Sequence, residues 1–431
     1  MAKVNRERAS LVGCCALIGL VLNPAQAAIV IDGYDTLVND RFANDPSFLL
    51  VEEDLSAIGR ANSRWGTLIS PNVIISAEHF HPTVNGSVLK FHQDNVPNGP
   101  SEQRRVIADQ RLGDSDLWVG ILESDLPEEY SPLPFATEEI NSVIDFNSSS
   151  YSGETVYLIG HSPTIYSGAT NMAAGVNVLE FFTSSVTVSG VTDVALGAIQ
   201  HLNGDSDFVA HEAYLQPGDS GGPLIHITNG QPTVIGINWF IAADAIDIDP
   251  SPMTEDMRSL SGFAYVGNYA TEIQEIIDAF AGNSGADYGT WRDVAFSGVS
   301  ELAQTGPNID YDLDGKTNFD EYALSLDPTD PNDFVGLTVS TAEVNNSEHG
   351  EITVRIREAG DVTYSVMVGN DLSGWSNSAV TFSGGSWSTD DALIATVVSE
   401  TDEGDGSWTV TIRDATALAS GNPRFISIEY L

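Results

Sequence analysis

Short apolar runs alternate with turn-forming residues between about residues 29 and 281. Thr155–Gly160 and Thr233–Ile237 are rich in Val, Ile and Leu, and Gly, Pro, Asn and Asp separate such runs. Runs of about four to eight residues with many β-branched side chains, bounded by turn formers, predict β-strands. Helical spacing is rare and is clearest at Ile273–Ile277. The pattern therefore predicts an all-β barrel or sandwich for this part of the chain.

The strand pattern stops near residue 282 and resumes near residue 335. Ala281–Ala286 is small and polar, as in a linker, and an acidic segment follows it. Glu351–Arg357 and Ser407–Ile412 again alternate apolar and polar positions. A chain of 431 residues exceeds the usual size of one core. After the N-terminal segment we therefore expect an all-β domain over 29–282, a linker with a small module over 283–334 and a separate β-sandwich over 335–431.

The first 28 residues have the pattern of a secretory signal peptide. Basic residues precede an apolar run from Leu11 to Leu22, and Ala25-Gln26-Ala27, with a small residue at each end, follows it. A membrane-spanning helix needs about 20 apolar residues, which is more than this run contains. We therefore expect export to the periplasm or the extracellular space, with no transmembrane segment in the exported protein.

Both cysteines of the chain, Cys14 and Cys15, lie inside this N-terminal segment. The mature protein is therefore expected to have no disulfide. Leu11–Cys14 resembles the cleavage box of a lipoprotein, but it precedes most of the apolar run. Lipidation is the less favoured alternative for that reason.

Acidic residues greatly outnumber basic ones. The chain has 61 Asp and Glu against 17 Lys and Arg, which gives a formal net charge of −44. Such a charge repels nucleic acid and anionic lipid surfaces, so neither is an expected partner. Strong self-repulsion also favours surroundings rich in salt or divalent cations, such as a marine or halophilic habitat.

One serine lies among glycines that permit sharp backbone turns, in Gly218-Asp219-Ser220-Gly221-Gly222-Pro223. A serine hydroxyl is a weak nucleophile, so it requires a base and a group that orients the base. Upstream, an apolar strand pattern over Gly66–Ala77 leads to His79, and Asp116 opens the strand pattern Leu117–Leu122. Asp109, Asp114 and Asp125 are nearby, but only Asp116 directly precedes a continuous apolar run. The order His, Asp, Ser is a candidate catalytic triad.

These three blocks resemble the trypsin/chymotrypsin-like serine proteases, and the resemblance covers roughly residues 29–282. Gly236–Phe240 and Gly262–Val266 also resemble late strands of that family. The resemblance implies two six-stranded barrels and a secreted serine endopeptidase that acts on peptides or proteins without a catalytic cofactor. It makes His79 the general base, Asp116 its orienting partner and Ser220 the nucleophile, with the amides of Gly218 and Ser220 as the oxyanion hole.

The resemblance also raises a question of activation. In the family, a freed α-amino group pairs with the aspartate before the serine, which is Asp219 here. Ile29 follows the expected signal cleavage region and could supply that group. The alternative is that Asp219 pairs locally and that no zymogen step exists. Both alternatives stay open at the level of sequence.

For substrate specificity, the resemblance places four residues at the primary pocket. The base of the pocket is the residue six before the nucleophile, Tyr214, and there is no acid at this position to pair with Arg or Lys. Phe240 replaces a glycine that usually keeps the entrance open. Asn238, Trp239 and Phe240 would line the cleft. We expect a shallow pocket that is not trypsin-like.

A calcium-binding pattern follows the first domain. Asp310 to Glu321 fits D-x-D-x-D-G-x5-E without a gap. In such loops, oxygen ligands at positions 1, 3, 5, 7, 9 and 12 surround the ion. We therefore expect a structural Ca²⁺ held by Asp310, Asp312, Asp314, the Lys316 carbonyl, Asn318 and Glu321. The segment resembles single DxDxDG units of bacterial secreted proteins, and an acidic turn without metal is the alternative.

Three other functions compete with the protease interpretation. The Gly-x-Ser-x-Gly spacing also occurs in α/β-hydrolases, but there a helix follows the serine and the histidine comes late in the chain. A catalytically silent binding protein on a protease fold is the second. In the third, the C-terminal sandwich carries the main function as an adhesion module with a cell-surface or polysaccharide partner. Trp375, Trp387 and Trp408 would then form a sugar platform, although core packing is the more common use of such residues.

Overall fold

The computed structural model describes residues 28–431 except 165–167, 202, 243–258, 282–285, 334–336, 360, 371–374, 376–378, 384–385, 390–391, 405, 420–423 and 431. The expected signal peptide lies outside the described residues. Strands account for 44% and helices for 15% of the structure, which confirms the predicted all-β class. Among the described residues, no helix is long and apolar enough to cross a membrane.

A closed six-stranded barrel forms the first half of the N-terminal domain. Its antiparallel strands follow the order β2 (Ile58–Ala61), β3 (Arg64–Ser70), β4 (Val73–Ala77), β7 (Leu117–Leu122), β6 (Ser101–Arg111) and β5 (Val88–His92). Every residue of β4 and β7 is buried, as the continuous apolar runs predicted. These two central strands pair directly and end beside each other, with Ala77 opposite Leu117. The residues that follow β4 and precede β7 are therefore neighbours.

The second half is a seven-stranded antiparallel sheet, where the resemblance had implied a second six-stranded barrel. Its order is β10 (Phe181–Val188), β11 (Val191–Ile199), β15 (Leu260–Tyr265), β14 (Gln231–Ala242), β13 (Pro223–Thr228), β8 (Thr155–Gly160) and β9 (Ala173–Val178). The hairpin of β10 and β11 extends one edge through a turn at Ser189 and Gly190, which both have positive φ angles of 52° and 90°. Three of the eight residues of β10 are exposed, whereas Phe182, Val186 and Val188 pack against the hydrophobic cores.

Short elements complete the domain. The strand β1 (Val30–Ile31) pairs with β12 (Ala213–Tyr214), and α1 (Thr36–Asn39) and α2 (Val143–Ser148) cover the edges. The helix α3 (Ala270–Phe280) contains the predicted helical spacing and buries Ile273, Ile276, Ala279 and Phe280.

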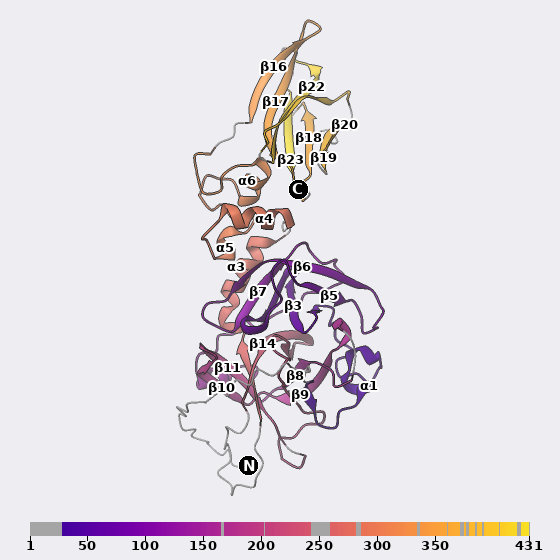
Figure 1. Ribbon diagram of the computed structural model, residues 1–431, viewed down its shortest axis with the longest axis vertical. Coiled ribbons are helices and arrows are strands. Elements are labelled where there is room, and N and C mark those ends of the chain that lie inside the picture. The colour runs from indigo at the N-terminus through magenta and orange to yellow at the C-terminus, as the bar shows by residue number, and fades with distance from the viewer. Residues whose placement is uncertain are drawn as a thin grey trace.

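Three further helices lie between the N-terminal domain and the C-terminal strands in Figure 1: α4 (Ala286–Ala295), α5 (Leu302–Thr305) and α6 (Asn318–Leu324). On one side, the amide of Leu302 donates to Gln110 of β6 at 2.6 Å. On the other side, Tyr288, Phe319 and Tyr322 belong to the hydrophobic core of the C-terminal strands. The helices α4 and α6 therefore share a core with the C-terminal strands, which a boundary at residue 334 would divide, whereas Leu302 of α5 belongs to the core of the N-terminal domain.

The C-terminal strands form two four-stranded sheets, in agreement with the expected β-sandwich. One has the order β16 (Thr338–Val344), β17 (Ser347–Arg357), β22 (Ser407–Ala417) and β21 (Ala395–Asp402). The other has the order β20 (Ser386–Thr389), β19 (Val380–Ser383), β18 (Tyr364–Gly369) and β23 (Phe425–Tyr430). Trp387 and Trp408 pack against the core between the sheets, so these two side chains are used for packing.

Candidate active site

The end of β4 presents His79 at the surface of the first barrel. A single 3-10 turn over Glu78–Phe80 follows the buried strand, and the amide of Glu78 donates to the carbonyl of Asp116 at 2.9 Å. The amide of His79 donates to Asp116 Oδ1 at 3.1 Å. The turn is thus fastened to the residue that precedes β7, which fixes where the imidazole can lie.

Asp116 contacts the imidazole through its other oxygen. His79 Nδ1 lies 2.8 Å from Asp116 Oδ2, and the carboxylate is fully buried whereas 37% of the His79 side chain is exposed. Since an ionised carboxylate only accepts hydrogen bonds, Nδ1 carries the proton and Nε2 is left as an acceptor. Asp109 accepts from Trp118 Nε1 instead.

Ser220 completes the arrangement from the second half of the domain. Its Oγ lies 2.9 Å from His79 Nε2, within hydrogen-bonding distance. The serine is in the loop between β12 and β13, and β13 continues directly from Pro223. The structure therefore brings together the three residues that the sequence singled out, and it joins them in the order carboxylate, imidazole, hydroxyl.

The loop around Ser220 requires its glycines. Gly218 has a φ angle of +110° and Gly221 one of +83°, which side chains with a Cβ rarely adopt. A Cβ at Gly221 would also lie 2.6 Å from Ser76 Oγ. Within the part of the chain that the structure describes, neither the amide of Gly218 nor that of Ser220 has a hydrogen-bond acceptor. Both expected oxyanion donors thus remain available.

Asn238 lies beneath this loop and does not line the cleft as the resemblance had implied. Its side chain is fully buried, and Nδ2 donates to the carbonyls of Ile159 at 2.8 Å and Asp219 at 2.9 Å. Its backbone also pairs with Gly221 and Gly222. The amide side chain therefore supports the nucleophile loop, since a buried group with two internal acceptors cannot contact a substrate.

The other three expected pocket residues differ in exposure. Trp239 is only 5% exposed and belongs to the main core. The ring of Phe240 packs on the backbone of Gly262, where a Cβ would meet it at 2.3 Å. Tyr214 is half-buried and pairs with Val30 through β12 and β1. Phe240 thus covers the backbone of Gly262.

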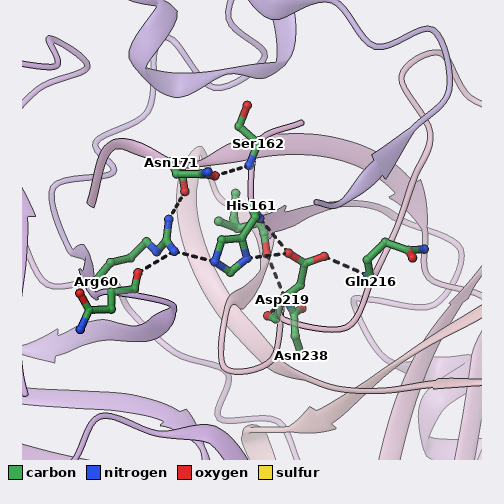
Figure 2. A network of polar contacts seen from close by, with 9 residues as sticks. Arg60, His161, Ser162, Asn171, Gln216, Asp219 and Asn238 are labelled. Carbon is green, nitrogen blue, oxygen red and sulfur yellow. Dashed lines mark hydrogen bonds and ion pairs between the residues drawn. The ribbon is translucent and has the colours of Figure 1, made fainter. Parts of the chain in front are cut away.

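A buried polar network surrounds Asp219, and sequence reasoning missed two of its members. As Figure 2 shows, the carboxylate of Asp219 faces His161, which in turn faces Arg60. Asp219 Oδ2 accepts from the amide of Gln216 at 2.9 Å. An isolated histidine after a strand and an arginine within one carry no motif, so no local signal could have identified them.

Ile29, the other residue expected in activation, is also buried here. It is 1% exposed, and its amide donates to the carbonyl of His161 at 3.0 Å. A Cβ placed on Gly160 would lie 2.7 Å from Asp219 Oδ1 and 2.9 Å from Ile29 Cβ. Ile29 and Asp219 are therefore neighbours across Gly160.

The expected calcium loop brings its first three carboxylates together. Ligand oxygens of Asp310, Asp312 and Asp314 all lie within 4.8 Å of one another. Gly315 has a φ angle of +100°, and its amide donates to Asp310 Oδ2 at 2.9 Å. Lys316 Nζ lies 2.7 Å from Asp314 Oδ2. The loop has the sharp turn that the spacing requires.

Glu321 and Asn318 come from α6, which begins after the loop with a capping box of Thr317 and Asp320. Glu321 is 1% exposed, and burial together with Asp312 and Asp314 raises the pKa of its carboxyl to about 8. Asp312 Oδ2, Glu321 Oε2 and Asn318 Oδ1 are buried without a partner among the described residues. The nitrogen of the Asn318 side chain donates to Gly306 O at 2.9 Å. Orphaned buried carboxylate oxygens fit a hard cation.

A second cluster contains Glu180, His201 and Asp207, whose ligand atoms also lie within 4.8 Å of one another. Here the imidazole already has partners: His201 Nδ1 is 3.1 Å from Glu212, and Nε2 is 3.5 Å from Glu180. Hydrogen bonds with Glu180 and Glu212 raise the pKa of His201 to about 10. The cluster is therefore a buried imidazolium between carboxylates.

Residues 65–237 match the sequence model of a protein family described as the trypsin-like peptidase domain. The matched segment runs from β3 into β14 and includes His79, Asp116 and Ser220. This match supports a function of the serine protease type in general, with peptides or proteins as the implied substrates. No curated protein matches the chain.

Proposed function

We propose that the protein is a secreted serine endopeptidase that cleaves peptide bonds through His79, Asp116 and Ser220. The observation that carries the proposal is the imidazole of His79, with one nitrogen 2.8 Å from a buried carboxylate and the other 2.9 Å from a hydroxyl. Three side chains from separate elements that meet in this order orient a base toward a nucleophile.

In the proposed reaction, His79 Nε2 takes the proton of Ser220 Oγ as the oxygen attacks the carbonyl carbon of the peptide bond. The negative charge that forms on the carbonyl oxygen is stabilised by the amides of Gly218 and Ser220. Asp116 holds the imidazole in place and stabilises its protonated form. The imidazolium then donates its proton to the leaving amine, and water hydrolyses the acyl-enzyme by the same route.

The proposed specificity excludes cleavage after Arg and Lys. Tyr214 offers no carboxylate to pair with a cation, and the Phe240 ring, which packs on Gly262, would narrow the pocket for large side chains. A long charged side chain buried without a partner is strongly disfavoured. Small residues before the scissile bond should therefore be preferred.

The experiment is to treat the mature protein with a serine-directed phosphonate and, in parallel, to profile its cleavage of a mixed peptide library. Labelling of Ser220 with cleavage after small residues supports the proposal. If Ser220 is not labelled and no library member is cleaved, the results favour the catalytically silent binding protein. Phe240 would then explain why its cleft is blocked. Strong preference for Arg would contradict the proposed pocket.

We also propose that Asp310, Asp312, Asp314, the Lys316 carbonyl, Asn318 and Glu321 hold a structural Ca²⁺. Support comes from the gathered carboxylates and from the buried oxygens of Asp312 and Glu321 that lack partners among the described residues. The ion would reduce the repulsion among these carboxylates and brace α6, whose Tyr322 belongs to the core of the sandwich. Calorimetric titration of the chelated protein with Ca²⁺ tests the site: one equivalent bound supports it, and no heat contradicts it.

A further inference from the structure

We propose that Arg60 and His161 are positioning residues of the candidate active site: they hold the Asp219 carboxylate, and through it the oxyanion loop, without a free α-amino group. The inference rests on the proposed function. It assigns to two residues inside the chain the role that the family's resemblance would give to a newly freed N-terminus. The chain would then need no cleavage at Ile29 to become active.

The first observation is how completely His161 and the loop surround Asp219. The carboxylate is fully buried. Asp219 Oδ1 accepts from the amide of His161 at 2.7 Å and faces His161 Nδ1 at 3.1 Å, and Oδ2 accepts from Gln216. A buried carboxylate is retained only when it is hydrogen-bonded and compensated by positive charge.

Arg60 supplies the positive charge through the imidazole. Arg60 Nη2 lies 2.5 Å from His161 Nε2. Because the guanidinium can only donate, Nε2 accepts, and the proton of the neutral ring is on Nδ1, where it points at Asp219. His161 therefore connects a cation and an anion that do not touch, and each ring nitrogen has a defined role.

The position of Arg60 is rigidly determined. The side chain is buried, its guanidinium lies 4.4 Å above the ring of Trp65, and Nη2 donates to the carbonyl of Asn62 at 2.7 Å. Nη1 donates to the carbonyl of Asn171. Burial lowers the pKa of Arg60 to about 10, and the charge of Asp219 opposes this shift, so the guanidinium stays charged at neutral pH.

The network reaches the oxyanion loop through the backbone of Asp219. Its amide donates to Gln216 O at 3.0 Å, and its carbonyl accepts from Gly222 at 3.1 Å. The peptide group after Asp219 carries the amide of Ser220, and the amide of Gly218 lies in the peptide group between Pro217 and Gly218, one group before the peptide that precedes Asp219. A carboxylate that turned away would rotate these groups, so the network determines whether both amides face the same oxygen.

The network also joins the two halves of the domain. Arg60 belongs to β2 of the closed barrel, and His161 directly follows β8 of the seven-stranded sheet. His79 lies on the barrel side and Ser220 on the sheet side. The two halves must therefore be held in one relative position for these side chains to meet at 2.9 Å. The Arg60–His161 contact helps to fix this relative position of the two halves next to the nucleophile loop.

Ile29 is the competing source of charge, because it is a neighbour of Asp219 across Gly160. The test compares two forms of the mature protein, one that begins at Ile29 and one that retains Ala27 and Ala28, with each N-terminus verified by intact mass. Active-site titration with the phosphonate gives the fraction of competent enzyme. We expect kcat/KM of the two forms to agree within about 2-fold, since an internal cation serves both.

Substitutions then test the two residues themselves in the extended form. Arg60→Met and His161→Leu should lower kcat at least 10-fold with little change in KM, because oxyanion donors act mainly in the transition state. Arg60→Lys should recover part of the loss by restoring the charge. Arg105→Met, which removes an arginine that is 48% exposed on the same barrel, is the matched control and should change neither constant.

Each outcome decides the proposal. Activity confined to the form that begins at Ile29 would overturn it while leaving the protease assignment intact. A folded Arg60→Met protein with unchanged kcat would also overturn it. If Arg60→Met does not fold, the comparison of the two N-termini alone decides. Failure of both forms to react with the phosphonate or to cleave any peptide would refute the proposed function and this inference with it.

Discussion

Ser220 Oγ and His79 Nε2 lie 2.9 Å apart although 141 residues separate them in the chain. The histidine is fixed by a turn at the end of β4, and the serine by a glycine-rich loop between β12 and β13. The contact between them exists only because the barrel and the seven-stranded sheet pack against each other. Asp116 is placed by a different principle, since β4 and β7 are paired neighbours within one barrel.

Ser220→Ala should abolish peptide hydrolysis and leave folding unchanged, because it removes the nucleophile and only one oxygen atom. We expect kcat to fall by about 10⁶-fold, and His79→Ala to be similarly severe, since members of a triad act as a unit. The measurement is single-substrate kinetics together with phosphonate labelling. Asp109→Asn, next to the site but bonded to Trp118, is the control and should retain turnover.

Phe240→Gly should widen the proposed cleavage specificity. Removal of the ring from Gly262 opens the space above that glycine, so peptides with large apolar residues before the scissile bond should gain about 10-fold or more in kcat/KM. Small residues should lose their advantage. Cleavage of matched peptides that differ at this one position provides the measurement, and an unchanged ranking would mean that Phe240 does not border the pocket.

The stability of the protease domain should depend on pH through His201. Hydrogen bonds with Glu180 and Glu212 raise the pKa of its imidazole to about 10, compared with about 6.5 in an unfolded chain. A raised pKa means that the folded state holds the proton more tightly. This contribution is therefore complete below about pH 6.5 and is lost as the pH rises toward 10.

His201→Gln should consequently lower the free energy of unfolding by about 2 kcal/mol at pH 6, and by progressively less as the pH approaches 10. Denaturant unfolding of both proteins at several pH values gives this difference. His226→Gln is the control, and its effect on stability should change with pH in the opposite direction. Burial lowers the pKa of His226, so protonation of this imidazole at falling pH destabilises the folded state. A difference that stays constant with pH would contradict the role of His201.

Calcium should protect the region between the two domains against proteolysis. Without the ion, repulsion among Asp310, Asp312 and Asp314 should open the loop and expose nearby peptide bonds within 283–334 to an added protease. Bound calcium at 100 times its dissociation constant would stabilise the module by about 2.7 kcal/mol. Turnover of a small substrate should change little, since the loop lies outside the protease domain.

Limited proteolysis and a peptidase assay, each with calcium and with chelator, measure both effects. Asp312→Asn and Glu321→Gln should remove the protection by calcium, whereas Asp330→Asn, an acid in a turn beyond the loop, should keep it. Equal cleavage with and without calcium in the wild type would refute the site. Loss of peptidase activity on chelation would indicate a second metal site in the protease domain.

Local chemistry in the sequence was sufficient for much of this molecule. The pattern of apolar and polar positions identified strands, since a strand with one face in solvent buries alternate side chains and a central strand buries all of them. The glycines at 218 and 221 marked a loop that needs positive φ angles, and the acidic spacing over 310–321 marked a turn that gathers carboxylates. Each of these signals is complete within a few residues.

Contacts between distant segments were decided only by the tertiary structure. Nothing near Arg60 or His161 in the sequence relates them to Asp219, because their roles come from the packing of β2 against the residue after β8. Asn238 is in a strand expected to line the cleft, yet the bulge between Asn238 and Phe240 directs its amide beneath the nucleophile loop. Tyr288 and Tyr322 likewise join the sandwich core across a predicted boundary. A sequence pattern specifies which face of an element is apolar, but the partner of that face depends on how the whole chain packs.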